Sequence, residues 1–116
     1  DLRTAEELGF ITGLLLKQFS NSYHHKNGKD FIKHRVMKFG SKLTPEMIWK
    51  GGVIRCEELA AQWEMKLASN FYRVLPHVLL AILDADKQNL LSREKDEFMT
   101  AFWSGHLMYR KPKEED

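Results

Sequence analysis

The chain has little cysteine and proline and no long hydrophobic run, with one cysteine and three prolines among its 116 residues. The single thiol, Cys56, cannot form an internal disulfide, which is typical of proteins in a reducing cytoplasm. Thr12 and Gly13 interrupt the apolar stretch 10–16, which is far shorter than the roughly 18 residues that span a bilayer. The first residues lack the basic-then-apolar order of a secretory signal. We therefore expect a cytoplasmic protein that does not cross a membrane.

Strand signals are also missing. No segment alternates apolar and polar residues with β-branched enrichment between turn residues, so we predict little or no sheet. The length and the hydrophobic fraction of 43% suit one compact domain. We predict a single all-α bundle of about five helices over residues 1–110, followed by a charged flexible tail over residues 111–116.

The sequence has no catalytic or metal-binding arrangement that we can identify. It contains neither a glycine-rich phosphate loop after a strand nor a serine nucleophile elbow. Zinc ligands occur at close, repeated spacing, and His24, His25, His34 and Cys56 do not. Cys56 shares a helical stripe with apolar residues, so we expect a buried, inert thiol.

Three carboxylates lie on the same helix as Arg55 and Lys66, in a sequence context without the apolar surroundings that raise a pKa. We expect ordinary surface ion pairs for Glu57, Glu58 and Glu64. These observations together predict a protein that is not an enzyme, has no cofactor or bound metal and takes no small-molecule substrate. A small enzyme whose site forms only on oligomerisation is a remaining alternative.

The first helix is predicted over residues 4–23, because Thr4 and Glu7 form a capping-box pattern before an apolar periodicity. Gly9 and Gly13 lie one turn apart in it, which indicates close packing against a neighbouring helix. Residues 24–28 contain turn formers and are predicted to be a loop.

A second helix is predicted over residues 29–39, with Ile32, Val36 and Phe39 facing inward and Gly40 ending it. Thr44 followed by Pro45 marks a third helix start. Whether Gly51-Gly52 interrupts or bends that helix is left open by the sequence.

An amphipathic helix is predicted over residues 53–71. Pro76 is expected to force a start or a kink, and the strongly apolar segment 78–83 is expected at the centre of the bundle. Ser92 is predicted to open the last helix, which would reach Tyr109 with an apolar stripe on one side.

The positive charge is concentrated in one quarter of the chain. The net charge is −2 over residues 1–16, +6 over residues 17–42 and −2 over residues 43–116. Solvated helices usually mix charges of both signs at i,i+4, whereas Asp30 is the only acid in the basic quarter. A solvated surface is the simplest interpretation, but self-repulsion of this kind favours a polyanionic partner whose phosphates supply the counter-charge. The candidate nucleic-acid-binding cations of this quarter are Lys17, Lys26, Lys29, Lys33, Arg35, Lys38 and Lys42.

Aromatic side chains at helical spacing usually belong to a core, and we interpret Trp49, Trp63 and Trp103 in that way. The segment Phe71-Tyr72-Arg73 is the one aromatic and basic junction that could lie at a surface and stack on a base. Arg73 is therefore added to the candidate nucleic-acid-binding residues.

Three segments have a familiar combined order. They are Gly9-Phe10-Ile11-Thr12-Gly13-Leu14-Leu15, then Leu75-Pro76-His77-Val78-Leu79-Leu80, and finally Leu91-Ser92-Arg93-Glu94 leading to Phe98 and Phe102-Trp103-Ser104-Gly105. This order resembles the helical C-terminal region of the large subunit of type I-B or I-D CRISPR Cascade complexes, which also occurs as a free small subunit. The likeness is a pattern of helices, glycines and aromatics that covers nearly the whole chain.

The resemblance implies a non-catalytic helical subunit that is present in several copies within an RNA-guided antiviral ribonucleoprotein. Such subunits support the guide–target heteroduplex and hold the displaced DNA strand, so the implied partners are guide RNA, target and non-target DNA, other Cascade subunits and further copies of the chain. Backbone binding in a basic groove without sequence readout is the matching mechanism. The alternative function is a helical protein–protein adaptor whose basic patch meets an acidic partner.

Overall fold

The computed structural model describes residues 4–28, 30–62 and 69–109, except for the side chains of residues 25–27, 34, 35, 69 and 70. Within these ranges the chain is helical and contains no strand, so the predicted all-α bundle is confirmed. Within the described residues the helical segments are more numerous than predicted, because several predicted helices are divided into shorter ones. In order they are α1 (Ala5–Asn27), α2 (Phe31–Arg35), the 3-10 helix η1 (Met37–Lys42), α3 (Pro45–Ile48), the π-helix η2 (Trp49–Ile54), α4 (Arg55–Gln62), α5 (Ser69–Lys87), α6 (Leu90–Arg93) and α7 (Lys95–Met108).

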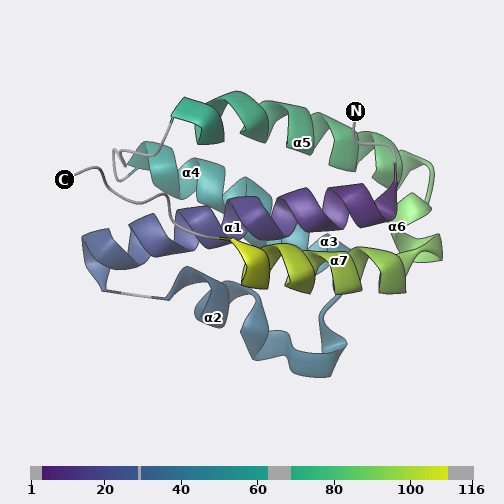
Figure 1. Cartoon of the computed structure of the whole chain (residues 1–116), viewed down its shortest axis with the longest axis horizontal. Coiled ribbons are helices and arrows are strands. Elements are labelled where there is room, and N and C mark those ends of the chain that lie inside the picture. Colours follow the sequence, from purple (N-terminus) through teal and green to yellow (C-terminus); the bar gives the residue numbers. More distant parts are fainter. Residues whose placement is uncertain (1–3, 29, 63–68, 110–116) are drawn as a thin grey trace.

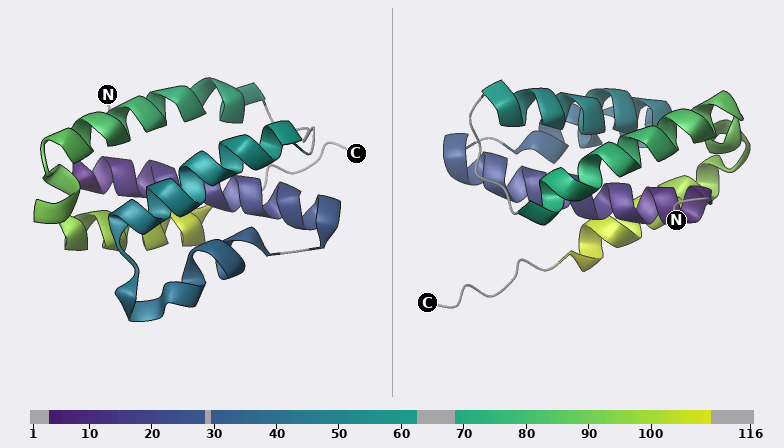
Figure 2. Two further views of the ribbon diagram at one scale, coloured as in Figure 1. Left: turned by 180° about the vertical axis from the view of Figure 1, so that it is seen from behind. Right: turned by 90° about the horizontal axis from the view of Figure 1, so that it is seen from above.

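Helix α1 runs through the middle of the molecule and contacts α7, α5, α2 and η2. Figures 1 and 2 show α5 on one side of α1 and the α2–η1 segment on the opposite side. The predicted tail over residues 111–116 lies outside the described residues. None of the helices that the structure describes combines the length and the hydrophobicity that crossing a bilayer requires.

The start of α1 confirms the capping-box prediction. The Thr4 hydroxyl accepts a hydrogen bond from the Glu7 backbone N–H, and the Glu7 carboxylate accepts one from the Thr4 N–H. The helix continues to Asn27, so the predicted loop over residues 24–28 is wrong for all but its last residue. No proline stops the helix earlier, and Gly28, with a φ of 74°, supplies the left-handed residue that ends it.

The two glycines of α1 let its backbone touch that of α7, as the sequence predicted. A Cβ atom on Gly9 would lie 2.2 Å from the carbonyl oxygen of Phe98, and one on Gly13 would lie 2.1 Å from that of Phe102. These contacts advance together along both helices, so α1 and α7 run parallel. Gly105 of α7 makes the reciprocal contact, because a Cβ atom on it would lie 2.2 Å from the carbonyl oxygen of Phe10 in α1. Neither helix has room for a side chain at these positions.

The predicted helix over residues 29–39 is broken in two. Asp30 caps α2, Val36 departs from helical geometry, and η1 follows. Ile32 and Val36 are buried as predicted, but Phe39 is 37% exposed. The prediction for Phe39 is wrong because the break after α2 rotates the following turn away from the core.

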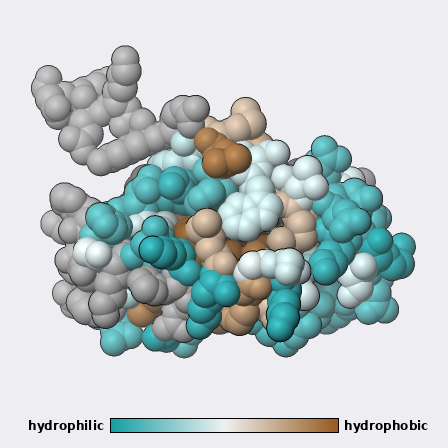
Figure 3. Space-filling view, turned by 90° about the horizontal axis from the view of Figure 1, so that it is seen from below, coloured by the Kyte–Doolittle hydropathy of each residue, from teal (hydrophilic) through white to brown (hydrophobic). Residues whose placement is uncertain are grey.

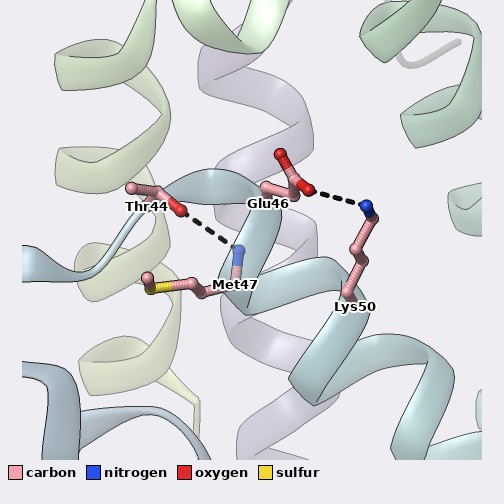
Figure 4. Close-up of polar contacts among 4 residues, drawn as sticks. All are labelled: Thr44, Glu46, Met47 and Lys50. Carbon is pink, nitrogen blue, oxygen red and sulfur yellow. Dashed lines mark hydrogen bonds and ion pairs between the residues drawn. The ribbon is translucent and has the colours of Figure 1, made fainter.

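Thr44 and Pro45 begin α3 as predicted, and the Thr44 hydroxyl accepts a hydrogen bond from the Met47 N–H at 3.2 Å (Figure 4). Gly51 and Gly52 do not end the helix, because the chain passes through η2 directly into α4. A Cβ atom on Gly52 would lie 2.9 Å from a methyl group of Leu16, so this glycine allows η2 to pack on α1.

The predicted amphipathic helix over residues 53–71 covers α4, undescribed residues 63–68 and the start of α5. Cys56, Leu59 and Ala60 are buried as predicted, whereas Trp63 lies outside the described residues. Helix α5 begins before Pro76 and includes it. A helix start at this proline is therefore wrong.

Helix α5 also lies at the periphery rather than at the centre. Val78 and Ile82 are fully buried, but Leu80 is 67% exposed and Leu83 is 41% exposed. The helix packs one face on α1 and leaves the other uncovered in the part of the chain that is described. A helix was correctly predicted for the apolar segment 78–83, but an apolar composition on both faces did not mean burial of both.

The last helix begins later than predicted. Ser92 belongs to the short α6, Glu94 is non-helical with a φ of −117° and a ψ of 42°, and α7 follows. Within α7, Phe98 and Phe102 are fully buried, as the predicted stripe requires.

Candidate nucleic-acid interface

The α2–η1 segment is attached to the bundle at both ends and exposed between them. At one end the Phe31 ring packs against Phe19 of α1, with ring centroids 4.9 Å apart, and Val36 is buried. At the other end Leu43 is buried. All six residues of η1 are exposed. Two hydrophobic anchors therefore hold this segment on the outside of the molecule.

This segment presents Lys33, Lys38 and Lys42 to solvent, and we call them the α2–η1 lysines. No ion pair joins any of them to a carboxylate of the residues that the structure describes. Gly40 lies between the last two with a φ of 55° and a ψ of −129°, a backbone conformation that favours glycine. The turn that separates Lys38 from Lys42 therefore depends on a residue without a side chain.

Two cations of the next segment, Lys50 and Arg55, do form ion pairs. The Lys50 ammonium lies 2.6 Å from a Glu46 carboxylate oxygen (Figure 4), and the Arg55 guanidinium lies 3.7 Å from that of Glu58. The Glu46 carboxylate accepts a hydrogen bond that raises the pKa of Lys50. Glu58 thus forms the surface ion pair that the sequence predicted. Lys38 has no acid three or four residues away. Lys33 follows Asp30 by three residues and Lys42 precedes Glu46 by four, but Asp30 caps α2 and Glu46 pairs with Lys50.

Asp30, the only acid of the basic quarter, is used as a helix cap. Its carboxylate accepts a hydrogen bond from the backbone N–H of Lys33 at 3.0 Å, and no ammonium group of the described side chains forms an ion pair with it. Other acids gather elsewhere. A separate groove at the N-terminal ends of α1 and α7 contains Glu6, Glu7, Asp96 and Glu97.

An exposed aromatic ring accompanies these cations. The Lys38 ammonium lies 5.2 Å from the centroid of the Phe39 ring, within the range of a cation–π contact. Figure 3, seen from the side on which α2 and η1 lie, shows hydrophilic side chains flanking a band of more apolar ones. Sequence reasoning missed Phe39 as a surface residue because its spacing matched the buried stripe.

The other predicted cations divide into three groups. Lys17 is half-buried and lines a pocket between α1, α2 and α7. Arg73 is exposed on α5, on the opposite side of α1 from the α2–η1 lysines, so the fold does not bring it together with them. Of the neighbouring Tyr72 and Phe71, the tyrosine is 44% exposed and the phenylalanine is fully buried. The third group lies outside the described residues and consists of the whole of Lys29 and the side chains of Lys26 and Arg35.

The pocket beside Lys17 has a volume of about 170 Å³ and contains residues that sequence reasoning did not select. Ser20, Asn21 and His24 share one face of α1 with Lys17, at positions i+3, i+4 and i+7. This polar face of α1 is the sequence feature that could have indicated the pocket. No sequence signal connected His106 of α7 with this site.

Cys56 is buried as predicted. Its thiol lies 3.0 Å from the Val53 carbonyl oxygen in a donor position. Burial, with a smaller contribution from the charge of Glu57, raises the pKa of Cys56 to about 12. The thiolate population is then far too small at neutral pH for nucleophilic chemistry.

Within the described ranges, no group of three or more histidine, cysteine, aspartate and glutamate side chains is placed to hold a metal ion. Comparison of the chain with protein-family models, with curated proteins and with solved structures finds no match.

Proposed function

We propose that this chain is a non-catalytic protein that binds the backbone of single-stranded nucleic acid through the α2–η1 lysines. The observation that supports this function best is that Lys33, Lys38 and Lys42 are exposed without carboxylate partners among the described residues. The phosphates of a nucleic-acid backbone supply the negative charge that these lysines lack. An exposed ring such as Phe39 provides a stacking surface that tolerates any base.

Salt dependence tests this function. Three lysine–phosphate contacts on a single strand should give a log–log slope of affinity against salt of roughly −2. Fluorescence anisotropy of a labelled single-stranded DNA, titrated at several KCl concentrations, measures this slope. Affinity that does not change with salt, or no binding at low salt, would contradict the proposal.

The biological setting that we propose is the small subunit of a CRISPR Cascade complex, in which the basic surface holds the displaced DNA strand and supports the guide–target heteroduplex. This proposal depends on the resemblance in the sequence and on the α2–η1 lysines. Neighbouring subunits or further copies would contact the uncovered face of α5, where Tyr72, Leu80 and Leu83 are exposed.

Affinity purification from the native host tests the setting. A tagged chain should co-purify with a guide RNA and with large Cascade subunits, and nuclease treatment should reduce the RNA without unfolding the chain. Recovery of one acidic protein without nucleic acid would instead favour an adaptor with a basic patch for that partner.

A further inference from the structure

The pocket beside Lys17 is lined by polar residues of α1 and by both polar and apolar residues of other segments. Lys17, Ser20, Asn21 and His24 project into it from α1, and Ser20 is almost fully buried. Four residues of three other segments complete the lining of the pocket. They are Asp30, Ile32, Met37 and His106.

The charges that face the pocket nearly cancel. The Lys17 ammonium is opposed by the Asp30 carboxylate, which also caps α2. Burial, followed by the charge of Lys17, lowers the pKa of His106, so its imidazole is neutral at pH 7. An anion held here would meet the Asp30 carboxylate. The electrostatics therefore favour a neutral ligand over a phosphate.

The remaining chemistry of the pocket suits a flat, polar-edged ring. Ser20 and Asn21 supply both donors and acceptors, as the edge of a nucleobase requires. Met37, which is 51% exposed, supplies apolar surface for the face of a ring beside the buried Ile32. Unstacked bases in single strands are recognised by this combination of edge hydrogen bonds and facial contact.

The pocket adjoins the proposed backbone-binding surface. Met37 lines the pocket and directly precedes Lys38, while Asp30 lines it and accepts a hydrogen bond from the Lys33 N–H. A strand whose phosphates meet Lys33 or Lys38 therefore passes beside residues that line the pocket.

We infer that this pocket accepts one unstacked nucleobase of the strand whose phosphates contact the α2–η1 lysines. The inference depends on the proposed function and adds to it a selection of single strands over duplexes. A base in a duplex is paired and stacked, so it must be extruded at a cost before it can enter.

Binding to matched strands tests the inference. Anisotropy should be measured with a single-stranded DNA, with an abasic strand of the same length and with the corresponding duplex. The double variant Asn21→Ala, His24→Ala removes two polar side chains of the α1 wall and should lose about tenfold in affinity for the base-bearing strand, the scale of one lost bidentate edge contact. It should lose nothing for the abasic strand. The matched control Gln62→Ala, His77→Ala changes exposed residues on α4 and α5 and should bind as the wild type does.

The outcomes separate the inference from the proposed function. Equal affinity of the pocket variant and the wild type for the base-bearing strand, with binding still dependent on the α2–η1 lysines, overturns the base pocket alone. An equal loss for base-bearing and abasic strands means that the pocket holds a phosphate, which also overturns it. No binding of any strand by the wild type overturns both proposals.

Discussion

Changing Lys33, Lys38 and Lys42 together to glutamate is expected to lower the affinity for single-stranded DNA at low salt by about a hundredfold or more. Each change removes one phosphate contact and places a like charge beside the strand. All three side chains are exposed, so the helices should be retained. Fluorescence anisotropy measures the affinity, and circular dichroism verifies the fold.

The control for this prediction reverses three other exposed or partly exposed cations, Lys50, Arg55 and Lys87. Both variants then carry the same net charge. If the DNA affinity of both variants falls by the same factor, binding depends on the total charge, and the α2–η1 lysines do not form a specific binding site. If the first variant binds DNA as well as the wild type does, these lysines do not bind nucleic acid, and an adaptor with an acidic protein partner is favoured.

Gly13→Ala is expected to lower the free energy of unfolding by about 3 kcal/mol, at the upper end of overpacking effects. Alanine normally stabilises a helix interior by roughly 0.5–1 kcal/mol relative to glycine. Here the added Cβ would lie 2.1 Å from the Phe102 carbonyl oxygen and 2.8 Å from the His106 backbone nitrogen. Backbone atoms cannot rotate aside, so α1 and α7 must separate and loosen the core between them.

Urea denaturation followed by circular dichroism measures this loss. Gly28→Ala is the matched control, because its Cβ would meet nothing within 4 Å and only its φ of 74° is strained. It should cost about 1 kcal/mol. A Gly13→Ala protein as stable as the wild type would mean that α1 and α7 are not in backbone contact.

The sequence by itself determined the elements whose causes are local. The Thr4 and Thr44 caps are made by hydrogen bonds to residues three positions away, so neighbouring residues suffice to predict them. The pair Gly9 and Gly13 predicted a close helix contact without naming α7 as the partner. The excess of lysine in residues 17–42 is likewise a property of the sequence, whichever way the side chains point.

Only the tertiary structure decided which faces are covered. The turn of η1 carries Phe39 outward beside Lys38, although Phe39 matches an apolar periodicity, and α5 leaves Leu80 at the surface, although Leu80 lies in a strongly apolar segment. Likewise, the pocket combines Lys17 with His106, which are far apart in the chain. Burial depends on contacts between segments that are distant in sequence. A periodic pattern indicates which face of a helix is apolar, but it does not indicate where the helix that covers this face lies.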